Sequence, residues 1–321
     1  INAVQKCNKY AAYLFGVFSV LVLGYLVVDT DWSAVFDRSA GSVAAMITGV
    51  GLIAAGGVSW IPSAPDFTRY LPRTASSKGI VGVTIGGAGI VVLPMVLMGM
   101  VMAVSTPDLA SASDPVSFLG EILPTWIAVP YLLIALIGML LINSMSMYSA
   151  GFTAQTLGFK IPRHWAVSVN AVISLVFGGV LMLVATSFMG SFIAFLSLLA
   201  VAFSAWVGVF GADMLRRTEY DGEALADTGR TSAYWYRGGF SPAAVAAWAV
   251  GLAAGLMFTT SDWFTGPLAA NNVIGEYGLG WVATVVISGL LYVVLPKPPV
   301  VVPTAPAERT EQPERSEALS V

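Results

Sequence analysis

Long apolar stretches recur along the chain and alternate with short polar segments. A helix that crosses a membrane needs about 20 mostly apolar residues. Eight stretches meet this requirement, and we predict a membrane-spanning helix in each of them: 10–28, 42–62, 79–104, 126–148, 165–186, 189–212, 241–260 and 278–296. The segments between them contain Pro, Gly, Ser and charged residues. The pattern therefore predicts an all-α polytopic membrane protein.

The second apolar stretch is interrupted by residues that disfavour a helix. Residues 42–73 read SVAAMITGVGLIAAGGVSWIPSAPDFTRYLPR, with glycines before Trp60 and prolines after it. Glycine weakens a helix, and proline removes a backbone donor and clashes with the preceding turn. In lipid, backbone groups freed in this way are tolerated only where protein or a water-filled cavity covers them. We interpret the interruption as a candidate binding site near the membrane midplane. A proline kink that only shapes helix packing is the alternative.

Composition agrees with a membrane location. The chain has 321 residues, of which 57% are hydrophobic and 10% are charged, whereas soluble domains carry about 25% charged residues. The net charge of −3 and the lack of a basic stripe give no reason to expect a nucleic-acid partner. Cys7 is the only cysteine and His164 is the only histidine. With no Cys or carboxylate cluster near His164, we expect neither a metal site nor a cofactor.

The basic residues predict the orientation of the chain. All but one of the 15 Lys and Arg residues lie at the two ends of the chain or in every second segment between the spans. Arg38 is the only basic residue in the remaining segments. The positive-inside rule therefore places both ends of this chain in the cytoplasm. Residues 298–321 are proline-rich and then charged, and we expect a disordered cytoplasmic tail after a membrane domain at 1–297. Because the chain starts with Ile1 rather than Met, we expect the parent protein to continue beyond its amino-terminal end.

The polar side chains within the predicted spans are uncharged. No acid, base or histidine lies in the middle of any of them, which argues against a membrane-embedded enzyme and against a proton relay. In the fourth span, Asn143 and Ser146 share one helical face. The Asn143 amide could read the edge of a ligand ring or form an interhelical hydrogen bond. Trp60 could stack on a flat ring or anchor the chain at the membrane interface.

Two further features lie on and after the sixth span. Ser197, Ser204 and Gly208 form a face of small residues, which favours close helix packing. Asp213 precedes two arginines at the predicted cytoplasmic end, where we expect a solvated helix end, with an ion pair or a gate contact as the alternative. The YWY sequence at 234–236 is expected at the membrane interface before the seventh span.

Three segments together resemble the nucleobase–cation symporter family of purine, cytosine, allantoin and hydantoin permeases. WIPSAPDFTRYLP (60–72) is similar to the exit of the family's sixth helix, and INSMSMYSAG (142–151) to its eighth helix. WVGVFGADMLRRTEYD (206–221) and YWYRGGFSPAAVAAW (234–248) are similar to the exit of the tenth helix and the loop that follows it. The resemblance implies a LeuT-type fold of two inverted five-helix repeats plus two helices. The present spans would be helices five to twelve, and the first four would be absent.

The resemblance also implies an activity and a set of site residues. The expected activity is secondary transport of a nucleobase or related planar heterocycle across a bacterial-type inner membrane by alternating access, and not catalysis. Gly57 and Trp60 would supply backbone and stacking contacts, and Asn143 would bond the edge of the heterocycle. Ser59 and Ser146 are weaker candidates by position.

One departure from the family bears on ion coupling. Sodium-coupled members have hydroxyl residues just before the eighth-helix asparagine, where this chain has Leu141 and Ile142. These side chains offer no oxygen to a hard cation, so we expect transport that is proton-coupled or uncoupled. Two alternatives remain open: a carrier of an amino acid or another small solute with the same fold, and a truncated membrane protein that does not transport.

Overall fold

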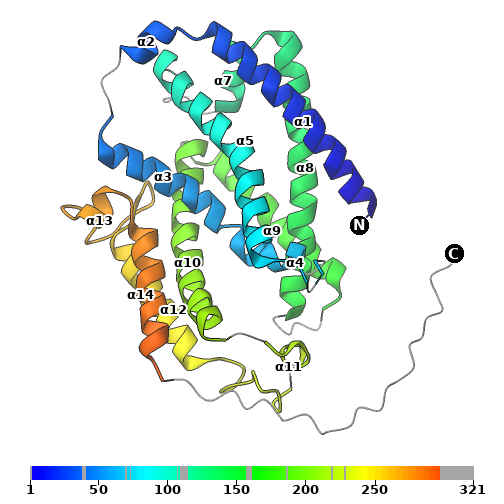
Figure 1. The fold of residues 1–321 in the computed structure, drawn as a ribbon, viewed down its shortest axis with the longest axis vertical. Coiled ribbons are helices and arrows are strands. Elements are labelled where there is room, and N and C mark those ends of the chain that lie inside the picture. The colour runs from blue at the N-terminus through cyan, green and yellow to red at the C-terminus, as the bar shows by residue number, and fades with distance from the viewer. Residues whose placement is uncertain are drawn as a thin grey trace, which may run out of the picture.

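The chain forms long helices with short connecting elements, as the computed structural model in Figure 1 shows. The structure describes residues 2–37, 41–68, 71–72, 74–106, 108, 115–156, 161–185, 187–217, 220–227 and 229–296. The predicted tail at 298–321 lies outside the described residues.

The long helices coincide with the predicted apolar stretches. They are α1 (Asn2–Asp29), α3 (Val43–Val58), α5 (Ser77–Ser105), α8 (Thr125–Thr156), α9 (Arg163–Leu183), α10 (Phe188–Arg216), α12 (Pro242–Met257) and α14 (Gly280–Val294). The shorter helical elements are α2 (Trp32–Phe36), the 3-10 turn η1 (Ile61–Ser63), α4 (Ala64–Thr68), α7 (Pro115–Ile122), α11 (Gly222–Ala226) and α13 (Val273–Glu276). Strands β1 (Thr260–Ser261) and β2 (Phe264–Thr265) form an antiparallel pair.

Two of the eight predicted spans are shorter than expected. Within the described residues, six helical segments are long and apolar enough to cross a membrane, which makes this a multi-pass membrane protein. α12 and α14 have 16 and 15 residues, or about 24 and 22 Å, less than the roughly 30 Å of a hydrocarbon core. α12 ends early because the chain turns into the β1–β2 hairpin, where the Gly266 amide donates to the Thr259 carbonyl. α14 begins late, after a left-handed turn at Gly278 with φ +63°.

One group of helices packs around large apolar side chains. The end of α1, the end of α5 and the start of α8 bury Val22, Met98 and Ile127 in a single cluster with α7 beside it. These helices lie together in the upper part of Figure 1. α8 continues downward from this cluster and carries the predicted site residues on its second half.

A second group of helices packs through small residues. On α10, Ser204 is fully buried and Gly208 lies against the backbone of α14. On α14, Thr284 and Ser288 are also fully buried, and Ser288 packs against Gly251 of α12. Small side chains let membrane helices approach closely, so the packing role predicted for Ser204 and Gly208 is confirmed. α3 crosses α10 and connects this group to α8 through η1 and α4 (Figure 1).

Candidate functional site

The predicted interruption of the second apolar stretch is present as a turn between α3 and α4. Ser42 caps the start of α3 by accepting a hydrogen bond from the Ala45 amide (3.1 Å). The helix then continues through Gly57 and ends at Val58. Pro62 lies in η1 and has no amide hydrogen to continue an α-helical ladder. The chain is therefore interrupted at 59–63, after the glycines rather than at them.

Three of the carbonyl groups at the end of α3 accept hydrogen bonds from the turn itself. The Ser59 amide donates to the Ala55 carbonyl (3.2 Å), and the Ser59 hydroxyl donates to the Gly56 carbonyl (2.7 Å). The Trp60 amide donates to the Gly57 carbonyl (3.2 Å). The Gly57 carbonyl, for which the resemblance implies a ligand contact, therefore already accepts a hydrogen bond within the turn. The Trp60 side chain is 48% exposed.

On α8, the predicted polar residues form a row that leads to the interrupted segment. Asn143, Ser146 and Ser149 follow one another at intervals of three, so each is a neighbour of the next on the helix surface. Ser149 is buried and its hydroxyl donates to the carboxylate of Asp66 in α4. This contact joins the two segments that carry the predicted site. Asn143 lies about 9 Å along α8 from it, at about 1.5 Å per residue.

An arginine fixes the same half of α8 against α9. The Arg163 guanidinium lies 4.1 Å from the ring centroids of both Tyr148 and Phe152. Its NH2 group also donates to the Tyr148 carbonyl (3.2 Å). Gly151 allows this approach, because an added Cβ would lie 3.1 Å from the Arg163 side chain. The end of α8 that faces α4 is therefore held on a second side.

The predicted site residues are not enclosed by the described part of the chain. Asn143 and Ser146 are exposed, and the Ser146 hydroxyl donates to the Ile142 carbonyl (3.2 Å) of its own helix. Within the described part of the chain, the Asn143 amide makes no hydrogen bond, and neither it nor Trp60 lines a described cavity. The alternative role of Asn143 as an interhelical hydrogen-bonding residue therefore finds no partner among these residues.

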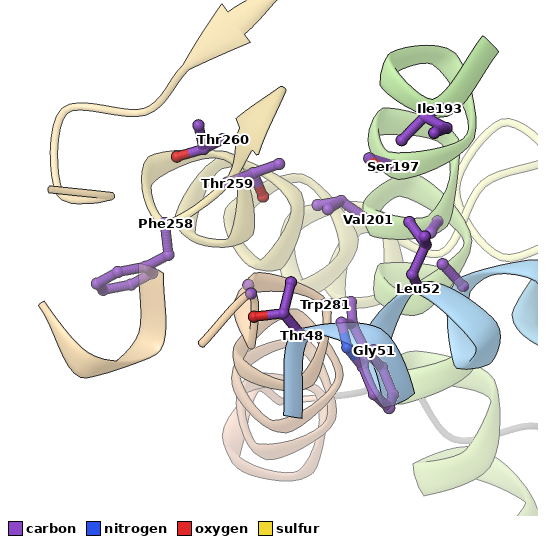
Figure 2. Close-up of a pocket in the computed structure, with 14 residues that line it drawn as sticks. Thr48, Gly51, Leu52, Ile193, Ser197, Val201, Phe258, Thr259, Thr260 and Trp281 are labelled. Carbon is purple, nitrogen blue, oxygen red and sulfur yellow. The ribbon is translucent and has the colours of Figure 1, made fainter. Parts of the chain in front are cut away.

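A partly enclosed cavity of about 320 Å³ lies beside α3, on the amino-terminal side of the interruption. Figure 2 shows residues from α3, α10, the end of α12 and the start of α14 around it. Its polar lining includes the hydroxyls of Thr48, Ser197 and Thr259, and Trp281 and Phe258 are also among the residues that line it. The sequence predicted close packing for Ser197, but the structure places it on the cavity wall. Sequence reasoning missed this cavity, because its walls come from segments up to 233 residues apart (48 to 281).

The end of α10 is bonded more extensively than predicted. The Asp213 carboxylate forms an ion pair with Arg217 (3.1 Å) and accepts hydrogen bonds from the hydroxyls of Tyr220 (2.8 Å) and Tyr292 (2.6 Å). The solvated helix end expected there is therefore wrong, because Tyr292 reaches it from α14. Tyr236 is one of the aromatic residues expected at the membrane interface, and its hydroxyl accepts a hydrogen bond from the Arg217 guanidinium (3.3 Å). Burial, followed by the hydrogen bond to Asp213, raises the pKa of Tyr220 to about 12.

Comparison with known proteins gives one family and one curated relative. The family model described as "Permease for cytosine/purines, uracil, thiamine, allantoin" matches residues 1–280. The relative named "Putative purine-cytosine permease YxlA", of Bacillus subtilis (strain 168), is 23% identical over 309 residues. The aligned region covers 93% of this chain and 64% of YxlA, so the chain spans less than two thirds of that relative's length. No solved structure matches the chain.

Proposed function

Because the chain belongs to the family of permeases for cytosine, purines, uracil, thiamine and allantoin, we propose that it is part of a secondary transporter for a neutral planar heterocycle. Family membership favours a transporter over an enzyme. The proposed substrate is a nucleobase or a close relative such as cytosine or a purine. It would be imported by alternating access, with one helix bundle rocking about a site near the membrane midplane. The membrane would be the bacterial inner membrane, with both ends of this chain cytoplasmic.

One observation carries the proposal: the interruption after α3 is joined to the polar row of α8 by Ser149 and Asp66. The exposed indole of Trp60 lies six residues before Asp66, and Asn143, whose amide makes no hydrogen bond among the described residues, lies six residues before Ser149. The indole would stack on a flat ring, and the amide, which has both donors and an acceptor, would bond the ring edge. Gly57, Ser59 and Ser146 would shape the site rather than bind through free groups, since the two hydroxyls already donate to backbone carbonyls.

We further propose that the fold is of the LeuT type and that the eight long helices correspond to helices five to twelve. The half-exposed state of Trp60 and the exposed state of Asn143 support a site that further helices of a longer protein complete. The 64% coverage of YxlA is in keeping with such a longer protein. A truncated protein that does not transport is the alternative for the chain as it stands.

Coupling to sodium through this part of α8 is disfavoured. Leu141 and Ile142 have no side-chain oxygen, and their carbonyls accept hydrogen bonds from Ser144 (2.6 Å) and Ser146 (3.2 Å). A hard cation requires several oxygen ligands, and two backbone oxygens are already engaged here. We propose proton-coupled or uncoupled transport. Uptake by the full-length protein that rises with sodium, and loses this dependence when the backbone near Leu141 is altered, would contradict this.

The test is an uptake assay on the full-length protein that carries this chain. Cytosine, adenine, uracil, allantoin and hydantoin compete for uptake of a labelled base, and amino acids form the comparison set. Trp60→Ala should abolish uptake of the aromatic bases while the protein stays in the membrane. Trp126→Ala, which removes a 69% exposed indole from the start of α8, is the matched control. Normal uptake by Trp60→Ala would refute the stacking role, and competition by amino acids alone would favour the carrier of another solute.

A further inference from the structure

The cavity between α3, α10 and α14 is suited to a neutral ligand. Among the described residues that line it there is no Asp, Glu, Lys or Arg. Its volume of about 320 Å³ is at the lower end of the range of small-molecule sites. Trp281 and Phe258 give it aromatic surfaces, and Leu52 and Val201 give it aliphatic ones. A charged solute would lose its hydration here without gaining a partner.

The polar groups around the cavity have hydrogen-bonding capacity left over. Within the described part of the chain, the hydroxyls of Thr48, Ser197 and Thr260 make no hydrogen bond. By contrast, the neighbouring Thr259 hydroxyl donates to the Gly255 carbonyl (2.8 Å). The Trp281 indole nitrogen at the cavity edge is buried and has no partner in the same described residues. Each free hydroxyl can both donate and accept, which matches the mixed donors and acceptors of a heterocycle edge.

The cavity and the interruption lie along the same helix, α3. Leu52 and Thr48 lie about two and three turns before the interruption, on the helix that the interruption ends. The distribution of Lys and Arg predicts that the start of α10, the end of α12 and the start of α14 face the outside of the cell. The cavity therefore lies on the outer side of the proposed central site and shares α3 with it.

We propose that this cavity is a second, outer binding position for the same class of neutral heterocycle, held by the hydroxyls of Thr48 and Ser197 beside the indole of Trp281. This inference rests on the proposed function, because it takes its ligand class from the transported base. A base that enters from outside would bind here before it reaches Trp60. Because α3 forms one wall of the cavity, an occupied outer position would also bias the position of the helix that carries the interruption.

The test is a count of bound base per chain in the full-length protein, purified in detergent. Equilibrium dialysis uses radiolabelled cytosine, uracil, adenine, allantoin and hydantoin in turn. The variant is the double substitution Thr48→Val and Ser197→Ala. It removes two hydroxyls that have no partner among the described residues, so it should leave the fold intact. The matched control is Thr84→Val with Ser174→Ala, which removes two hydroxyls from exposed positions of α5 and α9.

We expect two bound equivalents in the wild type and in the control. In the double variant, the outer position should bind at least about 10-fold more weakly, because two hydrogen bonds to the ligand are lost. One equivalent that is lost in the double variant but kept in Trp60→Ala would also support the outer position. This inference would be overturned if the wild type bound one equivalent of base and Trp60→Ala lost it. It would also be overturned if the double variant still bound two equivalents with unchanged affinity. Both results would leave the proposed function standing. No binding of any of the five bases would refute both.

Discussion

Replacing Gly208 by alanine tests the close contact between α10 and α14. A Cβ at Gly208 would overlap the Ser288 hydroxyl and the Val285 carbonyl oxygen of α14, and would come within 3.1 Å of the Gly289 amide nitrogen. The chain offers a matched control one turn later on the same helix. A Cβ at Gly211 would meet no atom within 4 Å.

The magnitude follows from which atoms must move. The Ser288 side chain can rotate, but the Val285 carbonyl belongs to the helix backbone, so α10 and α14 must separate. Extra carbon in a well-packed interface costs about 1–3 kcal/mol. Both substitutions gain the same helix propensity, about 1 kcal/mol for alanine over glycine. The difference between the Gly208→Ala and Gly211→Ala proteins therefore isolates the cost of separating the two helices.

The assay is thermal unfolding of the purified protein in detergent, followed by loss of the monodisperse peak on size-exclusion chromatography. At about 2 °C per kcal/mol, Gly208→Ala should unfold about 2–6 °C below Gly211→Ala. Gly211→Ala should be at least as stable as the wild type. Equal unfolding temperatures for the two variants would refute the close approach of α10 and α14.

Three further predictions concern single side chains. Asn143→Ala should weaken base binding by about 1–3 kcal/mol if it leaves a ligand group unpaired; an unchanged dissociation constant in equilibrium dialysis would assign the amide a packing role. Ser204→Ala should leave the unfolding temperature unchanged or raise it, because the buried hydroxyl has no partner in the described residues; a fall of several degrees would reveal a partner. Tyr220 should titrate near pH 12, so its hydrogen bond to Asp213 stabilises the protein fully below about pH 10 and is lost between about pH 10 and 12. The ultraviolet difference titration between wild type and Tyr220→Phe checks this, and a midpoint at pH 10 would contradict it.

The hydrophobic pattern by itself determined the order of the long helices and the fact that the second one is interrupted. These features are local, because about 20 consecutive apolar residues and a Pro62 within a few residues of Gly57 act on the backbone of their own segment. The sequence also determined that the polar residues within the apolar spans are uncharged. It placed the interruption a few residues early, because glycines are tolerated within α3 and the prolines set its end.

Only the tertiary structure decided which faces of these helices meet. Lipid is as apolar as leucine, so the apolar pattern of a membrane helix does not say which side packs on protein. Gly208 and Gly211 are alike in the sequence, yet an added Cβ would meet the backbone of α14 at Gly208 and no neighbouring helix of the described structure at Gly211. The hydrogen bonds of Ser149 to Asp66 and of Tyr292 to Asp213 join residues 83 and 79 positions apart. The cavity beside Trp281 exists only because four such segments fold around it.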